Sequence, residues 1–250
     1  MLNLYCYSWL IIIPVIYYGL INYFDKNNLY QKRTINNNKE NTIVSQILTS
    51  LVCVTYLSIS GLILYMKHSD KIINKDYYFA SDDNIINHLI IPMIFYQGWN
   101  TIITFLNKDL YSILYIVHHL LVILGGIFGL INYFQYYTII YFGLIEISNI
   151  FLSVIEYSRY EKYIEENKIL YNLNNLCFIS SFYTLRIILF QYYTINIFRI
   201  LINDRDIFFK NKYILQSSCT IIMSLILSYL QFLWGYKIYK EIIKIISKIE

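Results

Sequence analysis

The chain has 250 residues, of which 57% are hydrophobic and only 14% are charged, and its mean hydropathy is +0.46. A water-soluble domain carries roughly a quarter charged residues, so the composition excludes an ordinary soluble protein. The net charge is +4, and the lysines and arginines lie in loops and in the C-terminal tail rather than on one continuous face. This distribution gives no support to nucleic-acid binding.

The apolar residues form blocks of about 20, the length that crosses a hydrocarbon core of ~30 Å at a rise of ~1.5 Å per residue. Hydropathy therefore predicts an all-α polytopic membrane helix bundle of about seven spans. The predicted spans are residues 4–24, 43–66, 87–106, 111–131, 136–156, 173–200 and 213–240.

Two of these blocks have alternative interpretations. The first contains Pro14 and lacks both a basic n-region and a small-residue cleavage site, which favours a retained span over a cleaved signal peptide. The third contains Pro92, Gly98 and Asn100, so a re-entrant segment is the alternative, which leaves six spans.

The basic residues predict the orientation of the chain. Twelve Lys and Arg residues lie on the side of loops 25–42, 107–110 and 157–172 and of the C-terminal tail, and six lie on the opposite side. The positive-inside rule therefore predicts a lumenal or external N-terminus and a cytosolic C-terminus.

The C-terminal tail is basic along one stripe, at spacings of three and four residues. This stripe is predicted either to lie against anionic cytosolic head groups or to be solvated. Its lysines are Lys237, Lys240, Lys244 and Lys248.

The cysteines predict neither disulfides nor zinc, because all four lie in apolar blocks without a CxxC pattern. They are Cys6, Cys53, Cys177 and Cys219. No metal site is expected. Tyrosine and asparagine are abundant, with 28 Tyr in the chain, and we interpret this as compositional bias that gives single tyrosines and asparagines little weight.

An ionisable side chain inside a span costs several kcal/mol unless it is paired or hydrated, so each one is a candidate site residue. Four lie well away from the ends of the predicted spans, and a neutral glutamine accompanies them in the last span. They are His118, His119, Glu146 and Arg186, with Gln231.

The histidines are predicted to face the protein. His118, Val122, Gly125 and Gly129 follow one another at i, i+4, i+7 and i+11, and the glycines form a stripe on which another helix can pack. Neighbouring helical residues point ~100° apart, so the pair is unsuited to gripping one metal ion. Proton transfer suits histidine better, because it titrates near neutral pH.

The fifth span carries a polar seam that is also predicted to face inward, formed by Gly143, Glu146, Asn149 and Ser153. Glu146 and Arg186 both lie near mid-membrane by residue count. The sequence leaves two roles open for this pair: an ion pair that fixes helix register, or a catalytic couple.

Four segments in this order resemble the TLC-domain family, which comprises the ceramide synthases and related multi-pass lipid proteins. They are "YSILYIVHHLLVILGG", "FGLIEISNIFLSVIEY", "SFYTLRIILF" and "LQFLWGYKIYKEIIK". The resemblance covers roughly residues 43–246. It divides the chain into a first span and cytosolic loop (1–42), a TLC-like membrane domain (43–246) and a short tail (247–250).

The resemblance matches His118-His119 to the family's paired histidines, Glu146-Ile147-Ser148 to the Glu-x-Ser of its non-ceramide-synthase branch, and Leu230-Gln231 with Trp234 to its last span. Ceramide synthases carry a further arginine-glycine step and a pair of aspartates that are absent here. Asn100 stands where many members have an aspartate. The resemblance therefore favours the non-ceramide-synthase branch.

The resemblance implies lipid handling, and three functions follow as hypotheses. The first is binding of membrane lipids or regulation of membrane lipid composition, with the inward His118, His119 and Glu146 contacting a head group in a cavity that opens to the cytosol. The candidate catalytic residues are His118 and His119, and the candidate substrate-binding residues are Glu146, Asn149, Arg186, Gln231 and Trp234. The second is a ceramide-synthase-like acyltransferase of sphingolipid metabolism, with acyl-CoA as co-substrate and a histidine as general base. The third is a transporter or receptor.

Membrane lipids are the expected partners, with no resident cofactor, and the endoplasmic reticulum is favoured over the plasma membrane. The transporter or receptor hypothesis lacks an internal repeat and the usual receptor motifs. The sequence leaves the lipid and the oligomeric state open.

Overall fold

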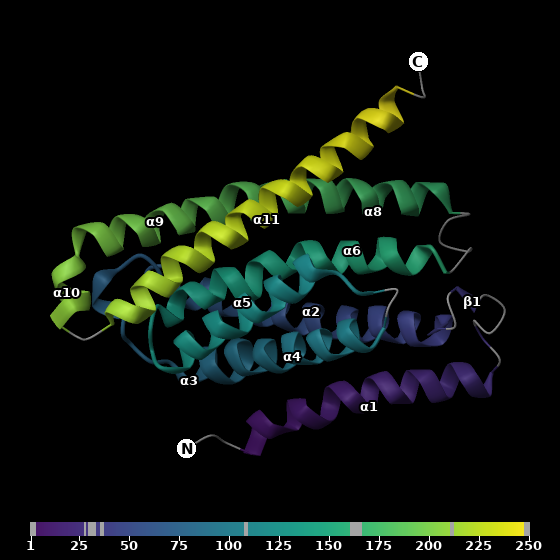
Figure 1. Cartoon of the computed structure of the whole chain (residues 1–250), viewed down its shortest axis with the longest axis horizontal. Coiled ribbons are helices and arrows are strands. Elements are labelled where there is room, and N and C mark those ends of the chain that lie inside the picture. Colours follow the sequence, from purple (N-terminus) through teal and green to yellow (C-terminus); the bar gives the residue numbers. More distant parts are fainter. Residues whose placement is uncertain are drawn as a thin grey trace. The chain divides into compact units, whose positions relative to one another are not determined.

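The computed structural model of the chain describes residues 4–27, 29, 34–35, 38–107, 110–160, 167–210 and 213–247. The chain forms two compact units, Met1–Phe178 and Ile179–Glu250. Almost all of the described chain is helical, as Figure 1 shows. The described residues also include one antiparallel pair of two-residue strands, β1 (Thr34–Ile35) and β2 (Asn38–Lys39).

The first unit contains most of the helices. Its elements are α1 (Leu4–Lys26), α2 (Glu40–His68), η1 (Lys75–Tyr77), α3 (Asp83–Ile85), η2 (Ile86–Ile90), α4 (Ile91–Leu106), α5 (Ile113–Leu130), η3 (Gln135–Tyr137), η4 (Ile139–Gly143), η5 (Leu144–Glu146), α6 (Ile147–Ser158) and most of α8 (Lys168–Ser181). The second unit continues from the end of α8 with η6 (Phe182–Leu189), α9 (Phe190–Asn203), α10 (Arg205–Lys210) and α11 (Ile214–Ile246).

Seven continuous helical stretches are long and apolar enough to cross a membrane, so the predicted all-α polytopic fold is confirmed. They are Ser8–Lys26, Glu40–His68, Asp83–Leu106, Ile113–Leu130, Gln135–Ser158, Lys168–Asn203 and Ile214–Lys244. Their ends differ from the predicted ends by a few residues, because the helices run on into polar flanking sequence.

The third stretch is one unbroken run of 24 helical residues, or ~36 Å at ~1.5 Å per residue, which is enough to cross the bilayer. It does not have the break expected of a re-entrant segment. Pro92 cannot donate a backbone hydrogen bond, and it lies in the first turn of α4, directly after the π-helical segment η2. The wider π turn, in which Ile91 N–H bonds to Ile86 O, lets the helix continue past the proline.

The helices of the first unit pack through aromatic rings and small residues. Trp9 of α1 packs on Tyr56 of α2 at 4.7 Å between ring centroids, and Tyr17 of α1 packs edge-on against Trp99 of α4 at 5.2 Å. On α5, a Cβ added to Gly126 would lie 2.6 Å from Ile94 Cγ1, and one added to Gly129 would lie 2.8 Å from Ile90 Cδ1. Glycines therefore let α5 lie directly on η2 and α4. The predicted glycine stripe included Gly129 but not Gly126.

The second unit is organised around the long helix α11. The Tyr183 hydroxyl donates to Gly235 O at 2.9 Å, and Gly235 leaves room for the side chains of Ile187 and Phe182. This hydrogen bond and the apolar packing at Gly235 hold η6 against α11.

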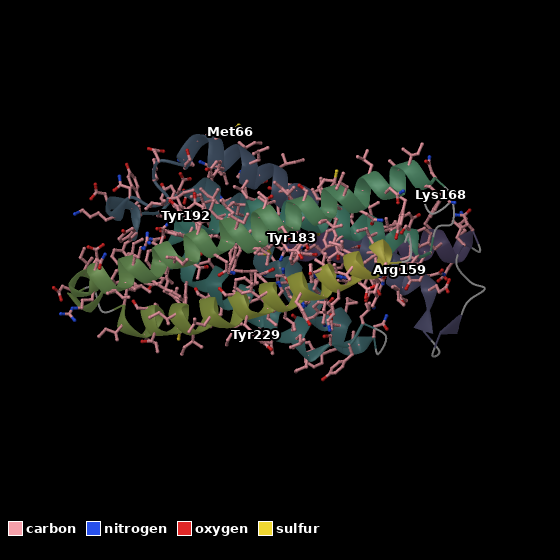
Figure 2. All side chains as sticks on the ribbon, turned by 90° about the horizontal axis from the view of Figure 1, so that it is seen from above. Met66, Arg159, Lys168, Tyr183, Tyr192 and Tyr229 are labelled. Carbon is pink, nitrogen blue, oxygen red and sulfur yellow. The ribbon has the colours of Figure 1, made fainter. Side chains whose placement is uncertain are left out.

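Large apolar side chains cover the outer surfaces of both units. Met66 in the first unit and Tyr192 and Tyr229 in the second are more than half exposed and are labelled in Figure 2. Such a surface is unfavourable in water and ordinary in hydrocarbon. Together with the seven apolar helices, it makes the chain an integral multi-pass membrane protein.

Three residues or groups of the sequence predictions lie outside the described part of the chain. They are the Lys108-Asp109 connection between the third and fourth spans, the Cys6 side chain, and residues 248–250 with Lys248 of the basic stripe. The other three cysteines carry free thiols.

Candidate functional site

Glu146 lies in the middle of the fifth span, where the helix is irregular. The π-helical segment η4 ends at Gly143, the 3₁₀ segment η5 follows, and regular α-helix resumes at Ile147. The Glu146 side chain ends this irregular stretch and is 4% exposed. Departures from α-helical geometry inside a helix are frequent at functional sites, so Glu146 is a candidate site residue on its geometry as well as on its charge.

A close approach of two glycines places this irregular segment against α2. A Cβ added to Gly143 would lie 2.5 Å from Gly61 Cα, 3.4 Å from Gly61 N and 3.5 Å from Gly61 C. Two helical backbones therefore touch where η4 crosses α2, and only glycine fits on either side. Since Glu146 follows three residues later, this contact sets the position of its carboxyl group.

The Glu146 carboxyl group is held by the next turn of its own helix. Asn149 Nδ2 donates to Glu146 Oε2 at 2.7 Å. Glu146 and Ser153 are buried and Asn149 is half-buried, so the predicted polar seam of the fifth span does face the interior. The structure thus brings together Glu146 and Asn149, two of the predicted site residues.

A second group of polar side chains continues from Glu146 toward α2 and α4. The buried Tyr96 hydroxyl lies within electrostatic range of the Glu146 carboxyl group and hydrogen bonds with the side chains of Ser50 and Asn100. Gln46 Nε2 donates to Asn100 Oδ1 at 2.5 Å. The polar network therefore extends from the fifth span to the second and third spans.

Gln46 connects this network to the face of α4 that meets α1. Trp99 Nε1 donates to Gln46 Oε1 at 3.1 Å, and Gln46 Nε2 also lies 3.4 Å from Ser50 Oγ. Tyr17 of α1 packs on the Trp99 ring. We call the set Gln46, Tyr96, Trp99, Asn100, Glu146 and Asn149 the mid-membrane polar network, after Glu146 at the centre of its span.

Sequence reasoning missed most of this network because it ranked ionisable residues and gave little weight to single tyrosines and neutral amides. A usable signal was present. Asn41, Ser45 and Thr49 follow the face of α2 next to Gln46, and all are buried, so polar residues at spacings of three and four mark the inward side of that span.

The paired histidines are carried by α5, and both are half-buried. Their ring centroids are 5.9 Å apart. The buried stripe of α5 contains Ile116, Val122 and Gly126, and at ~100° per residue His119 lies on this stripe while His118 lies at its edge. Of the two imidazoles, His119 is therefore the one directed into the bundle.

The histidines and Glu146 belong to helices that pack on different neighbours. The histidines lie on α5, which packs mainly on α4, whereas Glu146 directly precedes α6, which packs mainly on α2. A Cβ added to Gly126 of α5 would lie 3.7 Å from Phe142 Cε2, so α5 and the fifth span approach each other at this point. His119 precedes Gly126 by seven residues, and Glu146 follows Phe142 by four.

The other predicted site residues belong to the second unit. Arg186 is buried, lies inside the π-helical segment η6 and donates from Nη1 to Gln231 Oε1 at 3.4 Å. Its guanidinium carbon lies 5.9 Å from the Phe182 ring centroid. Trp234 follows Gln231 by one helical turn on α11 and is half-buried. The structure therefore joins Arg186 to Gln231.

Comparison with known families gives one result. The TLC-domain family profile matches residues 5–240. The chain belongs to the TLC-domain family. The match covers nearly the whole chain and includes α1 as well as the part from residue 43 onward. No curated protein and no solved structure matches the chain.

In this TLC-domain protein, a further polar cluster lies where α2 ends. Asp82 Oδ2 is 3.4 Å from His68 Nε2, and Asp82 Oδ1 accepts from Asn84 N at 2.9 Å as the cap of α3. The Asp82 backbone N–H donates to Gln135 Oε1 at 2.5 Å, and Gln135 Nε2 donates to Gly129 O at 3.1 Å. This cluster fixes the beginning of the span that carries Glu146.

The mid-membrane polar network can both donate and accept hydrogen bonds. A carboxylate only accepts, whereas side-chain amides and a phenol both donate and accept. Within the described residues, no group of three His, Cys, Asp or Glu side chains is arranged to hold a metal ion. The side chains of the network can therefore both donate hydrogen bonds to a ligand and accept them from it.

Proposed function

We propose that this TLC-domain protein binds membrane lipids or regulates membrane lipid composition through its intramembrane residues, as a member of the non-ceramide-synthase branch of the family. The single observation that carries the proposal is the burial of Glu146 at mid-span, where it accepts a hydrogen bond from Asn149 and lies within electrostatic range of the buried Tyr96 hydroxyl. Such polar groups are expensive in hydrocarbon and mark ligand sites in membrane proteins.

In this proposal the lipid head group hydrogen bonds with Glu146 and Asn149, and His119 contacts it from α5. Arg186, Gln231 and Trp234 are proposed as lipid-contacting residues within the second unit. The family resemblance to the Glu-x-Ser branch supports this assignment, as does the absence of the ceramide-synthase aspartates.

The test is the lipid that the purified protein retains. The wild-type protein and the variants Glu146→Gln and His119→Ala are purified in mild detergent, and their bound lipids are quantified by mass spectrometry. Loss of one hydrogen bond, worth about 0.5–1.5 kcal/mol, predicts a roughly two- to tenfold loss of bound lipid.

The matched control is Ser58→Ala, because Ser58 is buried in α2 and its hydroxyl has no hydrogen-bond partner among the described residues. This variant should retain lipid like the wild type. If the Glu146 and His119 variants fold normally and retain the same lipids in the same amounts, the proposal is wrong.

One observation favours a second candidate, a ceramide-synthase-like N-acyltransferase. His119 Nδ1 is buried and has no hydrogen-bond partner among the described residues, which suits a nitrogen that accepts a proton during a reaction. The amine of a long-chain base would attack the acyl-CoA thioester, His119 would take the amine proton, and the CoA thiol would leave.

This candidate predicts amide formation by the reconstituted protein from a long-chain base and acyl-CoA, and its loss in His119→Ala. If no amide forms while an authentic ceramide synthase is active in the same assay, the acyltransferase function is excluded.

For localisation we propose the endoplasmic reticulum membrane, with the N-terminus lumenal and the C-terminus cytosolic. The twofold excess of Lys and Arg on one side of the chain supports the orientation. Glycosylation-site tags at the two termini test it: only an N-terminal tag should be glycosylated.

A further inference from the structure

The last helix, α11, is longer than a membrane span. It contains 33 residues, or ~50 Å at ~1.5 Å per residue, whereas the hydrocarbon core is ~30 Å thick. Its first 23 residues, 214–236, carry no charged side chain, and the first charge is Lys237. The uncharged part alone is long enough to cross the membrane, so the helix from Lys237 onward extends past the hydrocarbon core.

The extension is a continuous helix up to Ile246 (the yellow end of α11 in Figure 1) and exposes two kinds of side chain. Lys237, Lys240 and Lys244 are exposed and fall within about 60° of one another around the helix axis, at ~100° per residue.

An apolar sector adjoins these lysines. Tyr236, Tyr239 and Ile243 are 54%, 53% and 46% exposed, and they fill the next ~60° of the helix surface. A helix that was merely solvated would have no need to expose two aromatic rings and an isoleucine beside its lysines. Lysines beside tyrosines and aliphatic residues are typical of a helix lying in the head-group layer.

The contacts within the extension fit the same environment. Lys240 Nζ lies 4.7 Å from the Tyr236 ring centroid, and Lys244 Nζ lies 2.6 Å from Glu241 Oε1. Glu241 compensates only one of the three exposed lysines. The sector therefore keeps a net positive charge next to its aromatic rings.

We propose that residues 236–244 form a binding surface for anionic phospholipid head groups, with Tyr236, Tyr239 and Ile243 inserted at the membrane interface and the three lysines contacting lipid phosphates and carboxylates. The occupant is the lipid leaflet next to the end of the seventh span. Charge complementarity is the basis of this choice, and the surface is separate from the mid-membrane polar network.

The test is hydrogen–deuterium exchange of the full-length protein in nanodiscs of phosphatidylcholine alone and of phosphatidylcholine with 30% phosphatidylserine. About 1 kcal/mol per lysine near an anionic surface is a roughly fivefold change per lysine in the docking equilibrium. Phosphatidylserine should therefore slow exchange of the backbone amides of 238–246. Replacing the three lysines with Gln, or adding ~1 M salt, where the Debye length is ~3 Å, should abolish this slowing.

A matched control removes three surface cations elsewhere, by Lys67→Gln, Lys75→Gln and Arg205→Gln. All three are exposed, and this variant should keep the phosphatidylserine effect. Equal exchange in both kinds of nanodisc would show that the three lysines face solvent or a soluble partner rather than anionic lipid. If phosphatidylserine still slows exchange when the three tail lysines are replaced with Gln, the anionic lipid binds to another surface. Either result overturns the proposal.

Discussion

Adding a single methyl group at Gly143 tests the contact that positions Glu146. In Gly143→Ala the new Cβ would lie 2.5 Å from Gly61 Cα, a backbone atom that cannot rotate away. Normal carbon–carbon contact is ~3.5–4.0 Å, so the two helices must separate by about 1 Å. Overpacking of this kind costs ~1–3 kcal/mol, and Gly61→Ala should cost a similar amount.

Gly98→Ala is the matched control, because a Cβ at Gly98 of α4 meets nothing within 4 Å. Here the substitution should be neutral or stabilise the helix by up to ~1 kcal/mol, from helix propensity alone. The assay is reversible unfolding in mixed micelles, followed by circular dichroism. If Gly143→Ala and Gly98→Ala change the free energy of unfolding by the same amount, the glycine contact does not constrain the fold.

Three further results are expected from the same unfolding assay. Asn149→Ala should destabilise the protein by ~1–3 kcal/mol because it removes the Asn149 amide that donates to the buried Glu146 carboxyl group. A double-mutant cycle with Glu146→Gln should show a coupling energy of ~0.5–3 kcal/mol. Strictly additive effects would contradict the hydrogen bond. Gln46→Leu should cost ~1–3 kcal/mol because it leaves the Trp99 indole N–H and Asn100 Oδ1 without Gln46 as a hydrogen-bond partner. Ser58→Ala should be nearly neutral, and equal effects of the two substitutions would argue against the network. Asp82→Ala should cost ~0.5–2 kcal/mol through loss of the α3 cap alone, and an unchanged free energy of unfolding would show that the cap does not contribute.

The sequence was sufficient to predict the spans, because span length and apolarity are set by the bilayer and need no knowledge of neighbouring helices. The inward direction of Glu146 also followed from a local pattern, since a polar seam at spacings of three and four has one energetically acceptable direction in lipid. The confirmed family membership rested on short motifs in a fixed order.

A residue pattern within one span could not predict which side chains of other helices lie near Glu146. Tyr96 and Gln46 come from other helices, and in a chain rich in tyrosine and asparagine neither residue type stands out by composition. The π and 3₁₀ segments before Glu146 were equally hidden, because they coincide with the backbone contact between Gly61 and Gly143, residues 82 positions apart in sequence. Such irregularities depend on tertiary packing rather than on local propensity.

The most direct test of the proposed lipid site is an experimental structure of the full-length protein in lipid nanodiscs at a resolution that shows bound lipid. We expect a lipid head group within hydrogen-bonding distance of the Glu146–Asn149 pair. A dry, sealed contact around Glu146, with lipid only on the outer apolar surfaces, would show that these polar residues serve helix packing and would contradict the lipid-binding role.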